Sequence, residues 1–174
     1  MTGKGSLNHN SRKFHAKNTD PNRTHWNVEY CNEDIKDVYH ELFDEALKRY
    51  NDKQTRKDRK IDDYYEKIRS GKQEKLFHEV ILQIGDKDNM GSETMEGQLA
   101  AKILDEYMKG FQERNPTLRV FAAHLHLDEA TPHLHIDFIP YVTGSKRGLD
   151  TRVSLKQALS SLGFKGGSRS ETEL

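Results

Sequence analysis

The sequence predicts an α+β fold in which helices flank an antiparallel sheet. Strand-like and helix-like runs alternate irregularly along the chain. The two best strand candidates, at 118–128 and 133–142, are joined by a short turn. A parallel, Rossmann-type arrangement fits less well, because parallel neighbours need a crossover of a dozen or more residues.

The first predicted helix lies in "NEDIKDVYHELFDEALKRY", residues 32–50. Its apolar residues recur at helical spacing behind a candidate N-cap at Asn32, and basic residues fill its last turn, where they complement the helix dipole. From 52 to 75 the composition shifts to charge, which indicates a charged arm with a short helix that ends near Gly71.

The later elements follow the same kind of evidence. "LFHEVILQIG", residues 76–85, is rich in strand-forming residues and is closed by a glycine. A second long helix is predicted within 92–116, capped near Ser92 and stopped before Pro116. A last helix at about 154–162 should lead into a flexible basic tail at about 163–174. We expect a single domain over residues 1–174.

The charge is balanced overall but divided along the chain. The formal net charge is +0, which argues against a simple polycation. Residues 1–28, 53–75 and 144–170 nevertheless carry net charges of +4, +4 and +5. These three basic segments could converge on a phosphate backbone, and the alternative is that each is an ordinary solvated loop. We expect contacts to such a backbone from these segments at Arg12, Lys146, Arg147 and Arg152.

Cysteine content and hydropathy indicate the compartment. The single cysteine, Cys31, excludes an internal disulfide framework, and no apolar run reaches the length of a signal-peptide core or a membrane span. Both observations predict a cytoplasmic protein without a membrane segment.

The segment "FAAHLHLDEATPHLHIDF", residues 121–138 and here called the histidine hairpin, contains four histidines. Side chains alternate between the two faces of a strand, so the histidines share one face and the leucines between them point to the other. A tight turn brings the two strands together, and His126, His133 and His135 can then converge on a metal ion. Three imidazoles leave coordination positions open for water or substrate, as catalytic sites require.

Other interpretations of the hairpin remain open. The triplet could hold a structural metal or none, although structural sites usually recruit cysteine or a fourth ligand. His124 could be that fourth ligand or a histidine paired within the sheet. Asp137 is expected to orient an imidazole. Asp128 and Glu129 lie in the turn, where solvated carboxylates are common.

The motif "HLDEATPHLH", residues 126–135, resembles the H-x-D-E-x-x-P-H-x-H motif of MobV-type mobilisation relaxases, also called plasmid recombination (Pre/Mob) enzymes, within the HUH endonuclease class. Two further stretches resemble amino-terminal motifs of the same family. They are "HNSR", residues 9–12, and "NTDPNRTHWN", residues 18–27. The resemblance therefore brackets most of the chain.

The resemblance implies an HUH-relaxase-like fold, a divalent ion, Mn²⁺ or Mg²⁺, on the three histidines, and nicking of single-stranded DNA at a transfer origin. It also implies a histidine nucleophile at the first residue of H-N-x-R, which is His9. Glu129 would orient or deprotonate His9, with Asp128 as a less favoured substitute, and Arg12 would steady the scissile phosphate. The alternative for His9 is an exposed residue in a mobile terminal segment.

The predicted function is that of a site- and strand-specific nickase that forms a covalent 5′-phosphate protein–DNA intermediate and then rejoins the strand, for plasmid mobilisation or recombination. A rolling-circle replication initiator or transposase of the HUH class is the first alternative, and a non-catalytic metal-containing DNA-binding module is the second. Relaxases of the family continue into long partner-binding regions. We therefore expect this chain to be one domain of a longer protein, with any homodimer formed through regions that it lacks.

Overall fold

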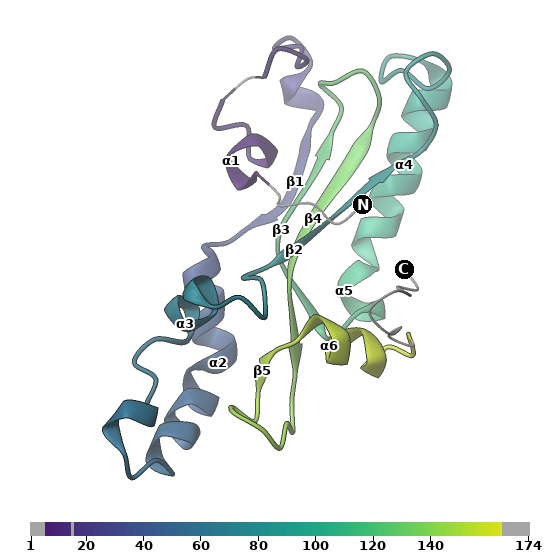
Figure 1. Ribbon diagram of the computed structural model, residues 1–174. Coiled ribbons are helices and arrows are strands. Elements are labelled where there is room, and N and C mark those ends of the chain that lie inside the picture. Colours follow the sequence, from purple (N-terminus) through teal and green to yellow (C-terminus); the bar gives the residue numbers. More distant parts are fainter. Residues whose placement is uncertain (1–5, 15, 165–174) are drawn as a thin grey trace. The chain divides into compact units, whose positions relative to one another are not determined.

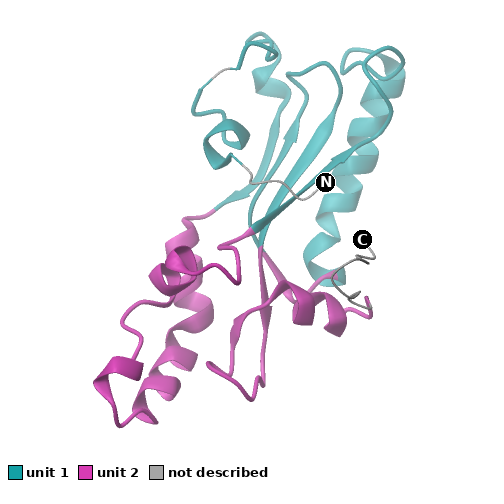
Figure 2. Ribbon diagram, in the orientation of Figure 1, with its two compact units in different colours: residues 1–32, 78–114, 120–138 teal, residues 33–77, 115–119, 139–174 magenta. Residues whose placement is uncertain are grey.

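The computed structural model describes residues 6–14 and 16–164, which divide into two compact units (Figure 2). Unit 1 comprises the described parts of residues 1–32, 78–114 and 120–138, and unit 2 comprises those of residues 33–77, 115–119 and 139–174.

Helices and strands alternate along the chain without a regular repeat (Figure 1). In order they are α1 (Leu7–Asn10), β1 (Val28–Asn32), α2 (Ile35–Asp52), α3 (Tyr64–Ser70), β2 (His78–Gln83), α4 (Met95–Lys109), α5 (Phe111–Arg114), β3 (Leu118–His126), β4 (His133–Val142), β5 (Arg152–Val153) and α6 (Leu155–Ser161).

The strands form a 5-stranded sheet in the order β1-β3-β4-β2, with β5 paired to β4. β1 runs antiparallel to β3, and both β2 and β5 run antiparallel to β4. The predicted α+β class with an antiparallel sheet is therefore confirmed. The sequence prediction missed β1, β5 and the short α1.

Two predicted helix starts were wrong. Asn32 does not cap α2, because it is the last residue of β1 and pairs with Ala122 of β3; Asp34 caps the helix by accepting from the Lys36 N–H. Ser92 does not cap α4 either. That position belongs to Thr94, whose hydroxyl accepts from the Gly97 N–H, while the Ser92 hydroxyl donates to the Glu129 carbonyl.

The remaining helix predictions differ less from the structure. The predicted long helix ends early, since α4 stops at Lys109 with Gly110 as its C-cap and α5 is a separate turn. The charged arm at 52–75 contains α3, which ends at Ser70 with Gly71 as its C-cap, close to the predicted end. α6 lies within the predicted range of about 154–162, and Ser154 is its N-cap. Of the basic tail, residues 165–174 lie outside the described residues.

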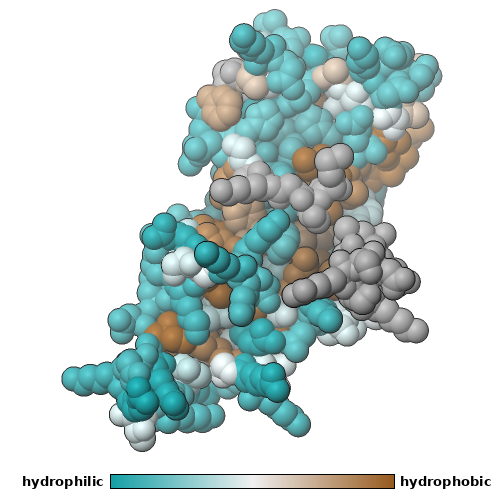
Figure 3. Space-filling model, viewed as in Figure 1, coloured by the Kyte–Doolittle hydropathy of each residue, from teal (hydrophilic) through white to brown (hydrophobic). Residues whose placement is uncertain are grey.

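In unit 1 the two faces of the sheet carry different kinds of side chain. The Tyr30 hydroxyl of β1 donates to Asp105 of α4 at 2.8 Å, which ties that helix to the sheet. One face of the strands is apolar and buried, with Phe121, Ala123, Leu125, Leu134, Ile136 and Phe138. The opposite face carries the histidines, as alternation requires. α4 itself presents an exposed apolar row of Met95, Leu99, Ile103 and Tyr107 (Figure 3).

In unit 2 an aromatic cluster joins two helices. The Phe43 ring of α2 lies 4.9 Å from Tyr64 of α3 and 5.2 Å from Tyr39. The Tyr64 hydroxyl accepts from the Val153 N–H at 3.2 Å, so the cluster also positions β5.

Within the described residues, no helix is both long and apolar enough to cross a membrane.

Candidate active site

Three strands of unit 1 place polar side chains on one face of the sheet. β3 contributes His124 and His126, and β4 contributes His133, His135 and Asp137, each set at alternate positions. β2 pairs with β4 so that Glu79 lies opposite Asp137. Residues directly opposite in an antiparallel pair share a face, so Glu79 joins the histidines.

The three predicted ligands, here called the histidine triad, converge in the structure. One ring nitrogen from each of His126, His133 and His135 lies within 4.8 Å of the other two. Their ring centroids are 4.8 to 5.2 Å apart. This spacing leaves room for a single ion among the three nitrogens.

Each imidazole of the triad has one nitrogen bound to a protein acceptor. Nε2 of His126 lies 2.8 Å from the Asn10 carbonyl, Nδ1 of His133 lies 2.8 Å from the Thr131 carbonyl, and Nδ1 of His135 lies 2.7 Å from the Glu79 carboxylate. An oxygen acceptor requires a proton on the nitrogen that faces it. The other nitrogen of each neutral ring therefore carries a lone pair.

Two of these lone pairs are buried without a hydrogen-bond partner among the described residues. They belong to Nδ1 of His126 and Nε2 of His135. Buried polar atoms are seldom left unsatisfied, and a bound cation would satisfy both. The three ring nitrogens thus fit a divalent ion, because imidazole nitrogen is a common ligand of divalent first-row metal ions.

Burial keeps two imidazoles of the triad in the form that binds a metal ion. Removal from water lowers the pKa of His126 to about 2, against the hydrogen bond to the Asn10 carbonyl. Burial likewise lowers the pKa of His133. Neutral imidazole is the metal-binding form, so both rings stay competent well below the usual histidine range.

The carboxylate that orients an imidazole is Glu79, not Asp137 as predicted. Asp137 lies two residues beyond His135 on the same strand, and its Oδ2 accepts from the Asn10 amide at 3.0 Å. Burial raises the pKa of Asp137 to about 7. Burial also opposes ionisation of Glu79, but hydrogen bonds from His135 and Asn10 outweigh it and lower the pKa of Glu79.

His124 is paired within the sheet. Its Nε2 lies 3.1 Å from the carboxylate of Glu29, the residue opposite it on β1. The structure therefore places His124 with Glu29, outside the triad, although its ring remains 6.1 Å from that of His126.

The amino-terminal segment brings His9 to the triad. The His9 ring lies 6.0 Å from the His126 ring and 6.3 Å from the His135 ring. The next residue, Asn10, is buried; its carbonyl holds His126, and its amide bridges Glu79 and Asp137. α1 is thereby fixed over the triad, and the side chain of His9 stays 24% exposed, which leaves it open to a substrate.

Arg12 connects this segment to the turn of the histidine hairpin. Its guanidinium donates to both carboxylate oxygens of Asp128 and, at 2.9 Å, to Oε1 of Glu129. A third donor lies 3.2 Å from Nε2 of His9. The side chain is 8% exposed, and the backbone adopts φ 51°. A non-glycine residue at positive φ has a conformational cost, which these contacts offset.

The two turn carboxylates have different surroundings. Asp128 is fully buried and also accepts from the Thr24 hydroxyl at 3.2 Å, so it holds the turn. Glu129 lies beside His9, with 3.4 Å between Oε1 and Nε2, and accepts from the Asn18 amide at 2.6 Å. Of the two, Glu129 is the carboxylate positioned for His9.

The site opens into a cavity of about 310 Å³. Its walls include His9, Glu129, His133 and His135, together with Ile81 and Gln83 of β2. The cavity therefore gives a ligand access to both the candidate nucleophile and the triad.

The other predicted DNA contacts lie in unit 2. Arg147 and Arg152 line one cavity, and Lys146 lines another. Arg12 is thus the one predicted contact that the structure places beside the triad.

The family model for "Plasmid recombination enzyme" (Mob_Pre) matches residues 4–163. The chain therefore belongs to the plasmid recombination enzyme family, and the family expected from the motifs is confirmed. This assignment favours a recombination enzyme over the rolling-circle initiator, the transposase and the non-catalytic module.

Similar solved structures are relaxase domains of MobM (MOBV; Mob_Pre) bound to plasmid pMV158 oriT DNA, with Mn. The structure at pH 5.5 with 22 nucleotides is 24% identical, covers 97% of this chain and 86% of that chain, and has a TM-score of 0.48. The structure at pH 6.5 with 23 nucleotides is also 24% identical, covers 97% and 84%, and has a TM-score of 0.45. No match was found among curated proteins. The family assignment rests on the family model.

Proposed function

We propose that the chain is a metal-dependent relaxase that nicks one DNA strand at a plasmid transfer origin through a covalent 5′-phosphate intermediate on His9. The observation that carries this proposal is the position of His9, beside three imidazoles that each offer one ring nitrogen within 4.8 Å of the others. Membership of the plasmid recombination enzyme family supplies the substrate class.

The histidine triad would hold Mn²⁺ or Mg²⁺, which supplies Lewis-acid stabilisation of charge on a scissile phosphate oxygen. The hydrogen-bond acceptors around the triad keep each imidazole ring in the tautomer that binds a metal ion. Asn10 serves His126, Thr131 serves His133 and Glu79 serves His135. Such partners set the orientation and basicity of the ligands.

His9 would provide the nucleophile. A guanidinium can only donate, so in the tautomer that leaves Nε2 of His9 unprotonated the lone pair of this nitrogen accepts from Arg12, and that hydrogen bond must break before Nε2 can attack. Attack on phosphorus would form an N–P bond and break the P–O bond to the 3′ oxygen. The substituted imidazole releases its ring proton, and the departing oxygen gains a proton to become the 3′ hydroxyl of the cut strand. A 3′ hydroxyl that attacks the phosphoramidate would reverse the step and rejoin the strand.

Glu129 and Arg12 would set the geometry of that step. Glu129 is held by Arg12 and Asn18 within 3.4 Å of His9, where it can orient the ring or take a proton from it. Asp128 would act through Arg12 and not on His9. We retain Arg12 as a contact to the scissile phosphate, and Lys146, Arg147 and Arg152 as contacts to the DNA backbone.

We also infer a cytoplasmic location, which a plasmid substrate and the single cysteine support. A homodimer stays a prediction.

A nicking assay on supercoiled plasmids that carry candidate origins tests the proposed function. We expect open circles in the presence of Mn²⁺, none after chelation, and none from a His9→Ala variant. The matched control is His40→Ala, which removes an exposed histidine of α2 that pairs with Asp44. Nicking by His9→Ala at the wild-type rate would refute the proposal.

A further inference from the structure

Asn10 joins the segment that carries His9 to the histidine triad. It is the buried residue of α1, with 2% of its surface exposed. Its carbonyl accepts from Nε2 of His126 on β3 at 2.8 Å. Its amide nitrogen donates to Oε1 of Glu79 on β2 at 2.8 Å and to Oδ2 of Asp137 on β4 at 3.0 Å. One residue therefore contacts three strands of the sheet.

The contacts of Asn10 reach two of the three triad ligands. The Asn10 carbonyl holds His126 directly. The amide acts on His135 through Glu79, whose Oε1 also accepts from Nδ1 of His135 at 2.7 Å. These are the two rings whose other nitrogen is buried without a hydrogen-bond partner among the described residues. His133 differs, because its acceptor is a backbone carbonyl in the turn of the hairpin, so Asn10 does not orient it.

The side chain of Asn10 suits its place between two carboxyl groups. Glu79 and Asp137 lie opposite each other on β2 and β4. The two hydrogens of an amide nitrogen can each serve one oxygen, whereas an ionised carboxylate in the same place could only accept. An alanine there would remove both donors, and buried polar groups that lose a partner are costly. Asn10 therefore supplies hydrogen bonds that neither an aspartate nor an alanine replaces.

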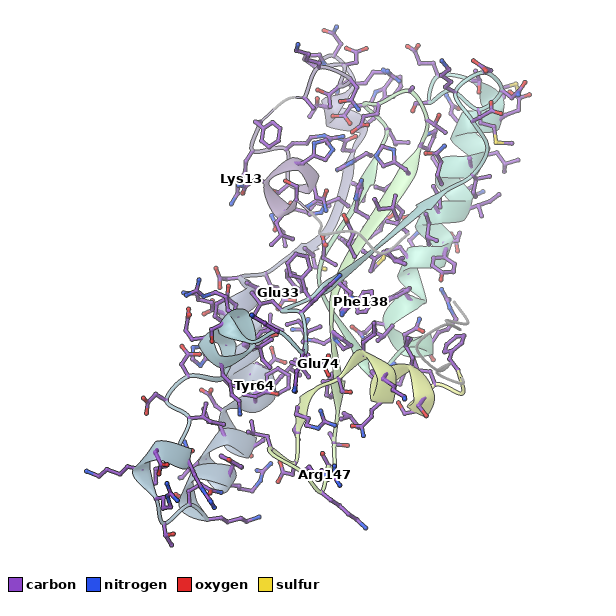
Figure 4. All side chains as sticks on the ribbon, in the orientation of Figure 1. Lys13, Glu33, Tyr64, Glu74, Phe138 and Arg147 are labelled. Carbon is purple, nitrogen blue, oxygen red and sulfur yellow. The ribbon has the colours of Figure 1, made fainter. Side chains whose placement is uncertain are left out.

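Asn10 is also the attachment closest to His9 in the sequence. It binds the sheet one residue after His9, and Arg12 binds the turn of the histidine hairpin two residues further on. Other residues of the same segment face the solvent. Lys13, which Figure 4 labels, and Asn8 are both exposed. The placement of His9 over the triad therefore depends on Asn10 on the side of the sheet.

We propose that Asn10 is a positioning residue that couples metal binding at the histidine triad to the placement of His9. Coordination through one nitrogen of an imidazole makes the N–H on the other nitrogen a stronger donor. The hydrogen bonds from His126 to Asn10 and from His135 to Glu79 should both strengthen in this way. Occupancy of the triad then holds Asn10, and with it His9, more firmly. The inference rests on the proposed function, because it takes His9 as the nucleophile.

The first test measures Mn²⁺ affinity of the full chain by titration calorimetry. Outer partners of metal ligands are worth roughly 10- to 100-fold in metal affinity, so Asn10→Ala should weaken Mn²⁺ binding by a factor in this range. The matched control is Asn8→Ala, which truncates an exposed asparagine of the same helix and should bind Mn²⁺ like the wild type. Circular dichroism checks that both variants are folded.

The second test is hydrogen exchange of backbone amides, which a merely structural role of Asn10 would not link to the metal. Coupling between two equilibria is reciprocal, so saturating Mn²⁺ should slow exchange of residues 7–12 in the wild-type chain by up to the factor that calorimetry gives. This slowing should be lost in Asn10→Ala saturated with Mn²⁺. Exchange of the turn at 127–132, which holds His133, should slow in both proteins. Asn10→Asp keeps the size of the side chain but not its donors, and it should behave like Asn10→Ala.

Three results would overturn the inference. They are wild-type Mn²⁺ affinity in Asn10→Ala, wild-type behaviour of Asn10→Asp, and exchange of residues 7–12 in the wild-type chain that Mn²⁺ leaves unchanged. The last of these needs no variant, so the inference stays testable even if a substitution prevents folding. All three measurements are made without DNA. Failure of the proposed function appears instead as absence of Mn²⁺-dependent nicking by the wild-type chain.

Discussion

Unit 1 and unit 2 present their polar side chains in opposite ways. In unit 1 the histidine triad is buried, and each ring is bound to a fixed acceptor. In unit 2, Lys67, Lys72 and Arg147 line one cavity and are exposed. Buried, preorganised ligands suit a step that depends on geometry, whereas exposed cations suit a long-range and salt-sensitive attraction to DNA. Substitutions in the two units should therefore have different consequences.

The largest expected effect follows from removal of two triad ligands. His133→Ala/His135→Ala should weaken Mn²⁺ binding by more than about 100-fold, which is the upper cost of losing only an outer partner. Nicking should be lost with it. Titration calorimetry measures the affinity, and circular dichroism checks that the variant is folded.

His124→Ala is the matched control, because it removes a histidine of the same face that pairs with Glu29. It should retain most of the Mn²⁺ affinity. A loss equal to that of the double variant would mean that His124 is a fourth ligand.

The next effect concerns the partner of His135. Glu79→Gln keeps the size of the side chain but removes the charge that holds Nδ1–H, so Mn²⁺ affinity should fall by about 10- to 100-fold. Glu29→Gln makes the same change next to His124 and should have little effect. If both variants bind Mn²⁺ like the wild type, Glu79 has no role in orienting a ligand.

The two units should differ in how strongly salt weakens the binding of their ligands. If Lys67, Lys72, Arg147 and Arg152, which line one cavity of unit 2, each neutralise one phosphate, DNA affinity should fall roughly 100-fold between 50 and 200 mM salt. Mn²⁺ binding should change far less, because the triad is buried and salt screens buried interactions much less than exposed ones. A DNA affinity that is independent of salt would contradict the electrostatic account of unit 2.

The smallest expected effect is on stability. Burial raises the pKa of Glu74, against the influence of Arg152 and the Leu155 N–H, so the folded state disfavours its ionised form. The free-energy cost of keeping Glu74 ionised in the folded state is present at pH 7. It disappears as pH falls below the pKa of about 4.3 that the group has in the unfolded state. Glu74→Gln should therefore raise the free energy of unfolding by less than about 1 kcal/mol at pH 7, and not at pH 4.

Urea unfolding at the two pH values measures this difference, with the exposed Glu93→Gln as control. Equal stabilisation by Glu74→Gln at both pH values would show that the gain does not come from the charge.

The histidine triad was predictable because the residues that form it lie close together in the sequence. His126, His133 and His135 lie within ten residues, and alternation along two strands joined by a turn decides their common face. The same logic located the buried Leu125, Leu134 and Ile136.

The outer partners were not predictable in the same way. Glu79 is 56 residues from His135, and strand pairing alone brings them together. The available signal was a carboxylate in the middle of an apolar strand, which needs a partner when it is buried. Arg12 and Asp128 are 116 residues apart, so their contact also depends on tertiary structure.

Helix boundaries show a third limit of prediction from the sequence. Asn32 and Ser92 are good capping residue types, yet pairing of β1 with β3 and the contact of Ser92 with the Glu129 carbonyl engage them elsewhere. Asp34 and Thr94 cap the helices instead. Tertiary contacts thus decide among caps that local propensity ranks alike.

The most direct test of the account is the chemistry of the trapped protein–DNA adduct. A tyrosine nucleophile is the main competitor, but the hydroxyl of Tyr30 in unit 1 is bonded to Asp105, and Tyr107 packs against Phe111. A phosphoramidate on His9 is acid-labile, whereas a tyrosine phosphodiester is acid-stable. We predict an adduct that is lost in mild acid and absent in His9→Ala; an acid-stable adduct that persists in His9→Ala would contradict the central claim.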